Sequence, residues 1–298
     1  MENIQGILVS LIAPFDNHIA NGGDKMLGNA SSIKRRPDGR VYVAGQMQRH
    51  VFFSALRKLN NIDPSKANTF VSNADGISEN LHDDLRADLG GFMHTEKGEL
   101  STRRTGALSV TVAVAKDESK VKNDLLNRMN SGSGENPAIA TKEFSQHDDM
   151  VMNFYLDMNT LSLTENFIYE DGFNVDVEYN DHGITIEERK RRALLFLKAT
   201  AMMNDYANQS RNAVCGEPRQ VVIVFDTIAS RKAMRYLTAS EQEQINIADE
   251  LNSRGAKMFV GDDTTSQSVN KAYLEAIKLL NASKLYDPVK NRKEKESD

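Results

Sequence analysis

The chain has 298 residues, with 37 Lys and Arg against 42 Asp and Glu, and its formal net charge at pH 7 is −5. This balance gives no reason to expect general affinity for nucleic acid, so local basic patches must carry any such role. Hydrophobic residues make up 40% and charged residues 27% of the chain, which excludes a protein that is disordered throughout. The length allows one large domain or two small ones.

Cysteine content and hydropathy argue against a disulfide-rich secreted protein and against a membrane protein. The single Cys215 cannot form an internal disulfide, and a free thiol suits a reducing cytosol, so we expect a cytoplasmic protein. No apolar run reaches the roughly 20 residues that cross a bilayer. The first residues, MENIQGILVSLIAPF, lack a basic segment before the apolar run, so we expect a strand here and no secretory signal.

The first part of the chain predicts a strand, a polar loop and a helix. GILVSLIAPF (6–15) is typical of a buried strand, and the Gly-rich polar residues 17–29 predict a loop. The sequence PDG at 37–39 has the composition of a turn. Residues 46–59 predict an amphipathic helix, because apolar residues recur at every third or fourth position, at Met47, Val51, Phe52, Ala55, Leu56 and Leu59.

Two polar segments interrupt the middle of the chain. Residues 60–102 are interpreted as an insertion with a short helix around 79–89, and residues 116–149, with a Gly- and Ser-rich centre, as a mobile excursion. The apolar, β-branched composition of 105–115 and the renewed strand character of 151–164 predict a strand on each side of that excursion.

The last third alternates helices with strands. We expect helices at 184–207, 240–255 and 268–281, strands at 219–228 and 257–261, and a flexible polar tail at 285–298. Strands separated by helices and broken by insertions predict an α/β or an α+β sheet. Periodicity alone leaves these two open, because the final units suit a doubly wound sheet as well as an antiparallel, ferredoxin-like one.

The residue types of common catalytic and metal sites do not occur in the required spacing. The six His are scattered without an HExxH pair, and a single Cys cannot build a Cys-rich zinc site. GxxxxGK[ST] and GxSxG are both absent. We therefore expect no metal, no cofactor and no catalytic centre.

The basic residues point to a different function. Residues 28–58 carry about +6, because one Asp opposes seven cations, Lys34, Arg35, Arg36, Arg40, Arg49, Arg57 and Lys58. Further polar and basic groups stand next to predicted elements, at Arg103-Arg104 and at Gln209-Ser210-Arg211. Such residue types bind phosphate oxygens, and sparse aromatic residues favour backbone contacts over base reading. The alternative interpretation of each cluster alone is a solvated charged face.

The order of the motifs carries a resemblance. NGGDKMLGN, SSIKRR, GQMQRHVFFSAL, RTGALSV and TKEF are followed by ANQSR and then by P-x-x-V-V-I-V-F. This succession resembles the backbone subunit of type I CRISPR surveillance complexes (Cascade), most like the DevR-type autoregulator branch of type I-B systems. The resemblance covers roughly residues 1–228.

The resemblance implies an α+β fold, a modified RNA-recognition-motif (ferredoxin-like) palm in a single domain over 1–298, with helical fingers at 60–102 and a thumb hairpin at 116–145. It implies a non-catalytic subunit that polymerises along the spacer of the guide RNA (crRNA) and presents it to target DNA in antiviral defence or guided targeting. The implied partners are crRNA, target DNA, further copies in a helical filament, the large subunit, the 5′-end cap subunit and the 3′-end processing endonuclease, without a membrane.

Carried over residue by residue, the resemblance implies that RNA is bound by Asn21, Lys25, Asn29, Lys34, Arg35, Arg36, Gln46, Arg49, Arg103, Arg104, Asn208, Gln209, Ser210 and Arg211. Leu125, Leu126 and Met129 of the thumb are candidates for an apolar wedge, or for simple hairpin packing. Asp24 stands in a loop comparable to that of related type III subunits that cleave RNA. We expect it not to be catalytic, because the type I pattern fits better.

Two alternatives belong to other classes of protein. A doubly wound enzyme that acts on a small substrate would need a crevice at the carboxyl ends of its strands. A DNA-binding regulator is suggested by the autoregulator label, although no helix-turn-helix spacing supports it. The guide-binding hypothesis predicts affinity that is insensitive to spacer sequence and steeply salt-dependent.

Overall fold

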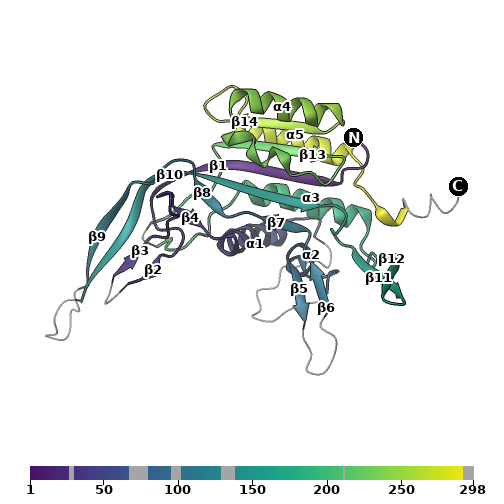
Figure 1. Ribbon diagram of the computed structural model, residues 1–298, viewed down its shortest axis with the longest axis horizontal. Helices are drawn as coiled ribbons and strands as arrows, with labels where there is room; N and C mark the ends of the chain where they lie inside the picture. The colour runs from purple at the N-terminus through teal and green to yellow at the C-terminus, as the bar shows by residue number, and fades with distance from the viewer. Residues whose placement is uncertain (27–29, 67–79, 95–101, 129–137, 211, 291–298) are drawn as a thin grey trace.

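The computed structural model describes residues 1–298 except 27–29, 67–79, 95–101, 129–137, 211 and 291–298 (Figure 1). Its main sheet contains, in spatial order, β14 (Lys257–Asp262), β13 (Gln220–Asp226), β1 (Gly6–His18) and β10 (Ala138–Asp157), with β7 (Leu108–Val110) and β8 (Ala113–Ala115) on the outer side of β10. These neighbours are all antiparallel. The α+β class is confirmed, and the strand order is compatible with a ferredoxin-like palm extended by β14.

Helices cover both faces of this sheet. On one face lie α1 (Gly45–Ile62), α3 (Ile186–Thr200) and α5 (Val269–Ala282), and on the other lie α4 (Glu241–Ser253) and the 3₁₀ helix η1 (Lys232–Thr238). Two covered faces explain why β1 is an almost continuous apolar run instead of an alternating one. Ser and Thr N-caps at 185, 240 and 268 fix the starts of α3, α4 and α5 through bonds from the third following N–H group.

Several smaller units project from this body (Figure 1). β9 (Val121–Arg128) pairs with the first half of β10 and forms a long arm. Below α1 lies a unit of α2 (Leu85–Gly90), β5 (Gly91–His94) and β6 (Thr102–Thr105). The others are the hairpin of β11 (Thr164–Glu170) with β12 (Phe173–Asn180), and the short strands β2 (Asp24–Lys25), β3 (Ser31–Ser32) and β4 (Tyr42–Val43).

The predicted strands and helices of the core are confirmed, and the differences lie in the projections. Residues 116–149, interpreted from composition as a mobile excursion, contain a two-stranded arm, in which β9 and β10 pair from Val121 to Ser145. A two-stranded arm buries little on either face, so its sequence is polar and lacks an alternating strand pattern. The strand expected at 151–164 ends at Asp157, and the β11–β12 hairpin was not predicted.

Two further boundaries differ from the prediction. The strand expected at 105–115 is divided into β7 and β8, and the helix expected at 184–207 ends at Thr200. Beyond Thr200 the chain turns inward and places Met203 and Tyr206 in the core. At the start of the expected tail, Leu285 is 7% exposed and bridges to Ile4, so this residue packs with the body of the protein.

Within the described residues, no helix combines the length and the apolar character that a bilayer crossing requires.

Candidate nucleic-acid interface

The loop that follows β1 is held by internal hydrogen bonds. The side-chain amide of Asn21 donates to the carbonyl oxygens of Lys34 (3.0 Å) and Tyr42 (3.1 Å), and its oxygen accepts from the Gly23 N–H group (3.0 Å). Asn21 is therefore 9% exposed and joins two segments of the chain. Lys25 is exposed on β2, and Asn29 lies outside the described residues.

Residues 31–43, which we call the basic loop, turn sharply at the predicted PDG sequence. The Gly39 N–H group donates to the Arg36 oxygen at 3.0 Å, and the Arg36 N–H group donates to the Arg40 oxygen at 2.9 Å. Gly39 has φ +79°, in the left-handed region that glycine adopts readily. The turn thus gathers Arg35, Arg36 and Arg40, whose side chains are 43%, 45% and 32% exposed.

The basic loop is anchored to the root of the β9–β10 arm by a small apolar cluster. Ile19, Ile33 and Val41 are buried together, and Val121 and Phe144 of the arm pack against them. The Ile33 N–H group donates to Glu143 of β10 at 3.1 Å. The position of the loop is therefore coupled to the arm, although Ile33 and Glu143 are 110 positions apart in sequence.

A buried polar network lies under the same junction. Asp148 accepts a hydrogen bond from Ser119 (2.5 Å) and lies 2.7 Å from Nε2 of His18. Burial alone would raise the pKa of Asp148, but the bonds from His18 and Ser119 outweigh it and hold that pKa below the ordinary value. The Ala20 N–H group donates to His18 Nδ1, which assigns the proton to Nε2. Asp148 stands between Ser119 and His18, so these residues do not form a nucleophilic triad.

The predicted motif at 208–211 lies beside the loop that follows β1. The Asn208 amide donates to the Ile19 oxygen at 3.2 Å, and the Asn212 amide donates to the Asn17 oxygen at 2.6 Å. Gln209 bonds within its own turn, to the Val214 oxygen at 3.4 Å. Ser210 is exposed, and Arg211 lies outside the described residues. Three segments distant in sequence therefore meet at one end of β1.

Two predicted residues lie on the first helical turns of α1, directly after the basic loop. Gln46 is exposed, and the N-cap Ala44 offers no side-chain bond to the helix start. Arg49 donates to the Gly90 oxygen at 2.8 Å and stands 5.9 Å from the centre of the Phe53 ring. Burial lowers the pKa of Arg49, and the charge of Arg86 lowers it further. Arg49 thus connects α1 to the α2 unit.

Arg104 has an internal role. It is 7% exposed, and its guanidinium donates to Asp88 at 2.9 Å and to the carbonyl oxygens of Asp88, Thr160 and Leu163. The backbone of Arg103 lies in β6, and its side chain is outside the described part of the chain, as are those of Leu126 and Met129. Leu125 is 68% exposed on β9.

Asp88 is the centre of a buried network that sequence analysis missed. It receives Arg104 and Arg192 (2.7 Å) and two hydrogen bonds from Ser162, both at 2.8 Å. Arg192 and Asp88 are fully buried. A run of charges such as ERKRR reads as a solvated helix face, and only the tertiary packing shows that Arg192 points inward.

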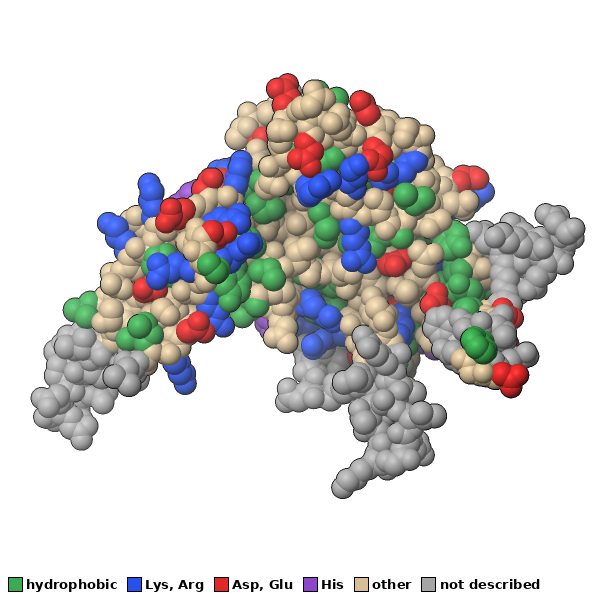
Figure 2. Space-filling view, viewed as in Figure 1, with side chains coloured by type: hydrophobic (Ala, Val, Ile, Leu, Met, Phe, Trp, Pro, Cys, Tyr) green, Lys and Arg blue, Asp and Glu red, His purple; other side chains and the backbone are tan. Residues whose placement is uncertain are grey.

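Figure 2 shows how charge is distributed over one face of the molecule. Lys and Arg side chains gather over the β9–β10 arm and the adjacent strands β2 and β3, at the left of the view, with Asp and Glu between them. The projection formed by the β11–β12 hairpin differs, because the segment 164–181 contains six acidic residues and no Lys or Arg. The six are Glu165, Glu170, Asp171, Asp176, Glu178 and Asp181.

The outer sheet face, which stacks bases in an RNA-recognition motif, is largely closed in this chain. η1 and α4 cover Leu8, Val222 and Val224. Tyr155, the aromatic residue of β10 on this face, is fully buried beneath Arg231, whose guanidinium lies 4.4 Å from the ring centre. Base stacking on this part of the sheet is therefore obstructed.

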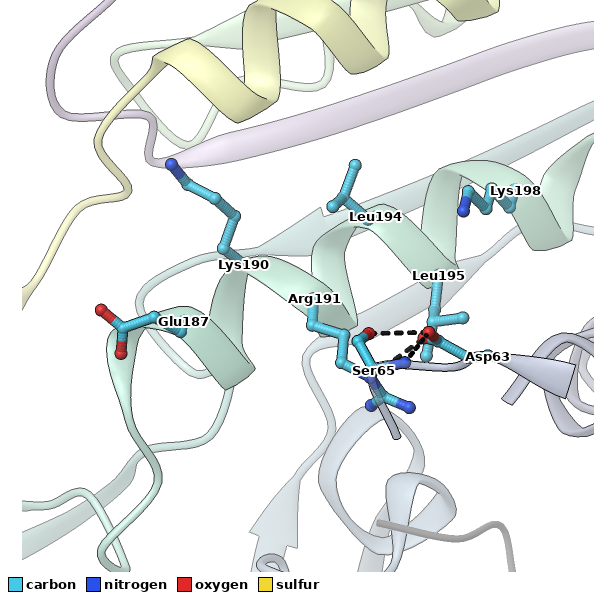
Figure 3. A pocket seen from close by; sticks show the side chains of 8 residues that line it. All are labelled: Asp63, Ser65, Glu187, Lys190, Arg191, Leu194, Leu195 and Lys198. Carbon is cyan, nitrogen blue, oxygen red and sulfur yellow. Dashed lines mark hydrogen bonds and ion pairs between the residues drawn. The ribbon is translucent and has the colours of Figure 1, made fainter. Parts of the chain in front are cut away.

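A cavity of about 230 Å³ lies between α3 and the chain that leaves α1 (Figure 3). Its wall is built by Asp63, Ser65, Glu187, Lys190, Arg191, Leu194, Leu195 and Lys198. Arg191 and Asp63 form an ion pair at 3.0 Å across it. This cavity lies on helices instead of at strand ends, so it does not match the crevice expected for a doubly wound enzyme. Among the described residues, no three His, Cys, Asp or Glu side chains are placed to hold a metal ion.

Comparisons with known proteins agree with this architecture. Residues 40–234 match the family model "CRISPR-associated negative auto-regulator DevR/Csa2". A chain of a solved "CRISPR RNA-guided surveillance complex" has 16% identity and a TM-score of 0.57, covering 93% of this chain and 99% of that one. A chain of a "CRISPR RNA-guided surveillance complex, pre-nicking" has 13% identity and a TM-score of 0.58 with the same coverage. These structural likenesses show the fold.

No sequence among curated proteins matches this chain. The family model, however, spans well over half of the chain and includes the end of the basic loop, the β9–β10 arm and the turn at 208–211. The chain therefore belongs to the family of CRISPR-associated negative auto-regulators DevR/Csa2.

Proposed function

We propose that this protein is a backbone subunit of a CRISPR surveillance complex, in which it binds guide RNA by its phosphate backbone. The observation that carries the proposal is the convergence of the basic loop, the loop after β1 and the turn at 208–212 beside the β9–β10 arm. Cations, amides and a hydroxyl exposed together are the donors that bind phosphate. Family membership and the fold of known surveillance-complex chains support the same function.

The proposed RNA contacts are the exposed members of the predicted set, Lys25, Arg35, Arg36, Gln46 and Ser210, together with the partly exposed Lys34 and Arg40 of the basic loop. Asn21 and Asn208 would position these groups, because their amides are bonded to the backbone. Arg104 is not among the proposed RNA contacts, because its guanidinium donates hydrogen bonds to acceptors inside the protein. The obstructed sheet face supports gripping of the backbone instead of base stacking.

In this proposal the β9–β10 arm is the thumb and the α2–β5–β6 unit belongs to the fingers. Copies would stack along the crRNA spacer of a type I-B Cascade and hold it for pairing with target DNA. The other Cascade subunits would be the neighbours at the two ends of the guide. The subunit would not cleave nucleic acid, and Asp24, which faces Lys34 at 3.4 Å, would not be catalytic.

The first test is purification of the protein with and without a co-expressed CRISPR array. Absorbance at the nucleic-acid and protein maxima, together with light scattering after size exclusion, measures bound RNA and mass. The proposal predicts a large multimer that contains RNA of defined length only when the array is present. A monomer or dimer free of nucleic acid in both preparations would contradict it, and preference for a palindromic duplex over single-stranded RNA would favour a DNA-binding regulator.

A further inference from the structure

Every cation of the basic loop faces a carboxylate in the free protein. The ion pairs are Lys34 with Asp24 (3.4 Å), Arg35 with Glu143 (3.4 Å), Arg36 with Asp38 (3.6 Å) and Arg40 with Asp38 (2.7 Å). The four cations of the basic loop and these three carboxylates together carry one net positive charge. The strong charge that the sequence places here is therefore largely neutralised by the fold.

The three carboxylates come from separate parts of the chain. Asp24 stands on β2, Asp38 in the turn itself, and Glu143 on β10, where its second bond to the Ile33 N–H group fixes it under the loop. The hydrogen bond from Arg40 lowers the pKa of Asp38 below its ordinary value. Two of the three thus reach the loop only through tertiary structure.

The geometry of these pairs suits exchange with phosphate. Three of the four distances are 3.4–3.6 Å, longer than a good charge-assisted hydrogen bond, and the side chains are partly exposed. Such pairs are weak in water, so a phosphodiester can take the place of the carboxylate. A carboxylate presents its two oxygens to a guanidinium in the same way as a phosphate does.

We propose that Asp24, Asp38 and Glu143 are specificity-determining residues, which compete with RNA phosphates for the basic loop. The inference rests on the proposed function and extends it. Because each copy must displace its own carboxylates, one copy binds a stray nucleic acid weakly, whereas copies aligned on one guide add their contacts. The carboxylates thereby favour long guide RNA over short or transient partners.

The test is a variant in which the three charges are removed with little change of shape, Asp24→Asn, Asp38→Asn and Glu143→Gln. Binding is measured against a labelled single-stranded RNA of about six nucleotides, within the range that one small binding domain covers. We expect the dissociation constant to fall about tenfold, because weak competing pairs are lost. We also expect a steeper dependence on salt, by up to about 0.7 in the log–log slope for each freed cation.

A matched control removes three carboxylates that pair with cations elsewhere, in the variant Glu2→Gln, Glu243→Gln and Glu250→Gln. Glu2 pairs with Lys284, Glu243 with Arg235, and Glu250 with Lys232 and Arg254. It changes net charge equally and should leave affinity near that of the wild type. A folded triple variant with unchanged affinity, or an equal gain in the control, would overturn the inference alone. Failure of the wild-type protein to bind either guide RNA or the short RNA would overturn the proposed function with it.

Discussion

The basic loop and the buried network around Asp88 contain similar arginines in opposite settings. Arg35 and Arg36 of the loop are almost half exposed and face carboxylates at 3.4–3.6 Å. Arg104 and Arg192 are buried and bond to Asp88 at 2.9 and 2.7 Å. The first pair can exchange partners with a ligand, and the second holds the protein together. Burial, more than sequence charge, separates binding groups from structural ones.

The sharpest test of this difference is removal of the buried carboxylate. Asp88→Ala removes the buried carboxylate shared by two guanidinium groups, which leaves Arg104 with carbonyl oxygens alone and Arg192 with Glu188. We expect the free energy of unfolding to fall by about 3–5 kcal/mol. Urea denaturation measures the change. Asp38→Ala, which removes an exposed carboxylate with two arginine partners, should change that free energy by less than about 1 kcal/mol. Similar losses in both variants would contradict the distinction.

Charge reversal in the basic loop should weaken RNA binding strongly and leave the stability of the fold nearly unchanged. Lys34→Glu, Arg35→Glu and Arg36→Glu together should weaken RNA binding about a hundredfold or more at moderate salt, because several phosphate contacts become repulsive. The free energy of unfolding should change little, since these side chains make only exposed pairs. Filter binding measures affinity, and the variant Lys232→Glu, Arg235→Glu, Lys284→Glu is the matched control. Equal losses in both would show a general charge effect.

The network under the loop predicts a dependence of stability on pH. The folded pKa of Asp148 lies below the ordinary value of 3.8, so its contribution is present at higher pH and is lost as pH falls through 3.8 to the folded pKa. Asp148→Asn removes this contribution, so the variant should lose less stability than the wild type between about pH 5 and pH 3. Urea denaturation across that pH range measures the free energy of unfolding of the wild type and of the variant. If the free energy of unfolding falls equally with pH in the variant and in the wild type, Asp148 does not contribute to this pH dependence.

The smallest expected effect concerns Asp24. Because it faces Lys34 and is proposed to act only as a competitor of phosphate, neither the wild type nor Asp24→Ala should cut an RNA complementary to the guide when Mg²⁺ or Mn²⁺ is added. Gel electrophoresis of end-labelled RNA gives the result. Metal-dependent cleavage that disappears in Asp24→Ala would show a catalytic subunit instead.

The core elements were predictable because their sequences carry a clear apolar pattern, either a continuous run or a helical period. The run GILVSLIAPF and the three- and four-residue spacing of 46–59 correspond to β1 and α1. Residue patterning did not indicate the β9–β10 arm or the β11–β12 hairpin, because a two-stranded projection buries too little for its apolar residues to alternate. A hairpin at 116–145 was expected only from the family resemblance.

The candidate site was predictable in composition and only partly in role. The turn at 37–39 and the basic residues around it could be recognised, since turn chemistry and charge are local properties. The burial of Arg104 and Arg192 could not, because it depends on Asp88 and Ser162, which are distant in sequence. The same holds for the pairing of Arg35 with Glu143, across 108 positions.

Ultraviolet cross-linking of the assembled protein to its RNA, followed by mass spectrometry of the linked peptides, locates the RNA-binding surface directly. We expect cross-links in the basic loop and in the peptide around Ser210. We expect none at Arg104 or along the buried outer face of β1 and β13. Cross-links concentrated on the sheet face or on α3, with the basic loop unlabelled, would contradict this expectation.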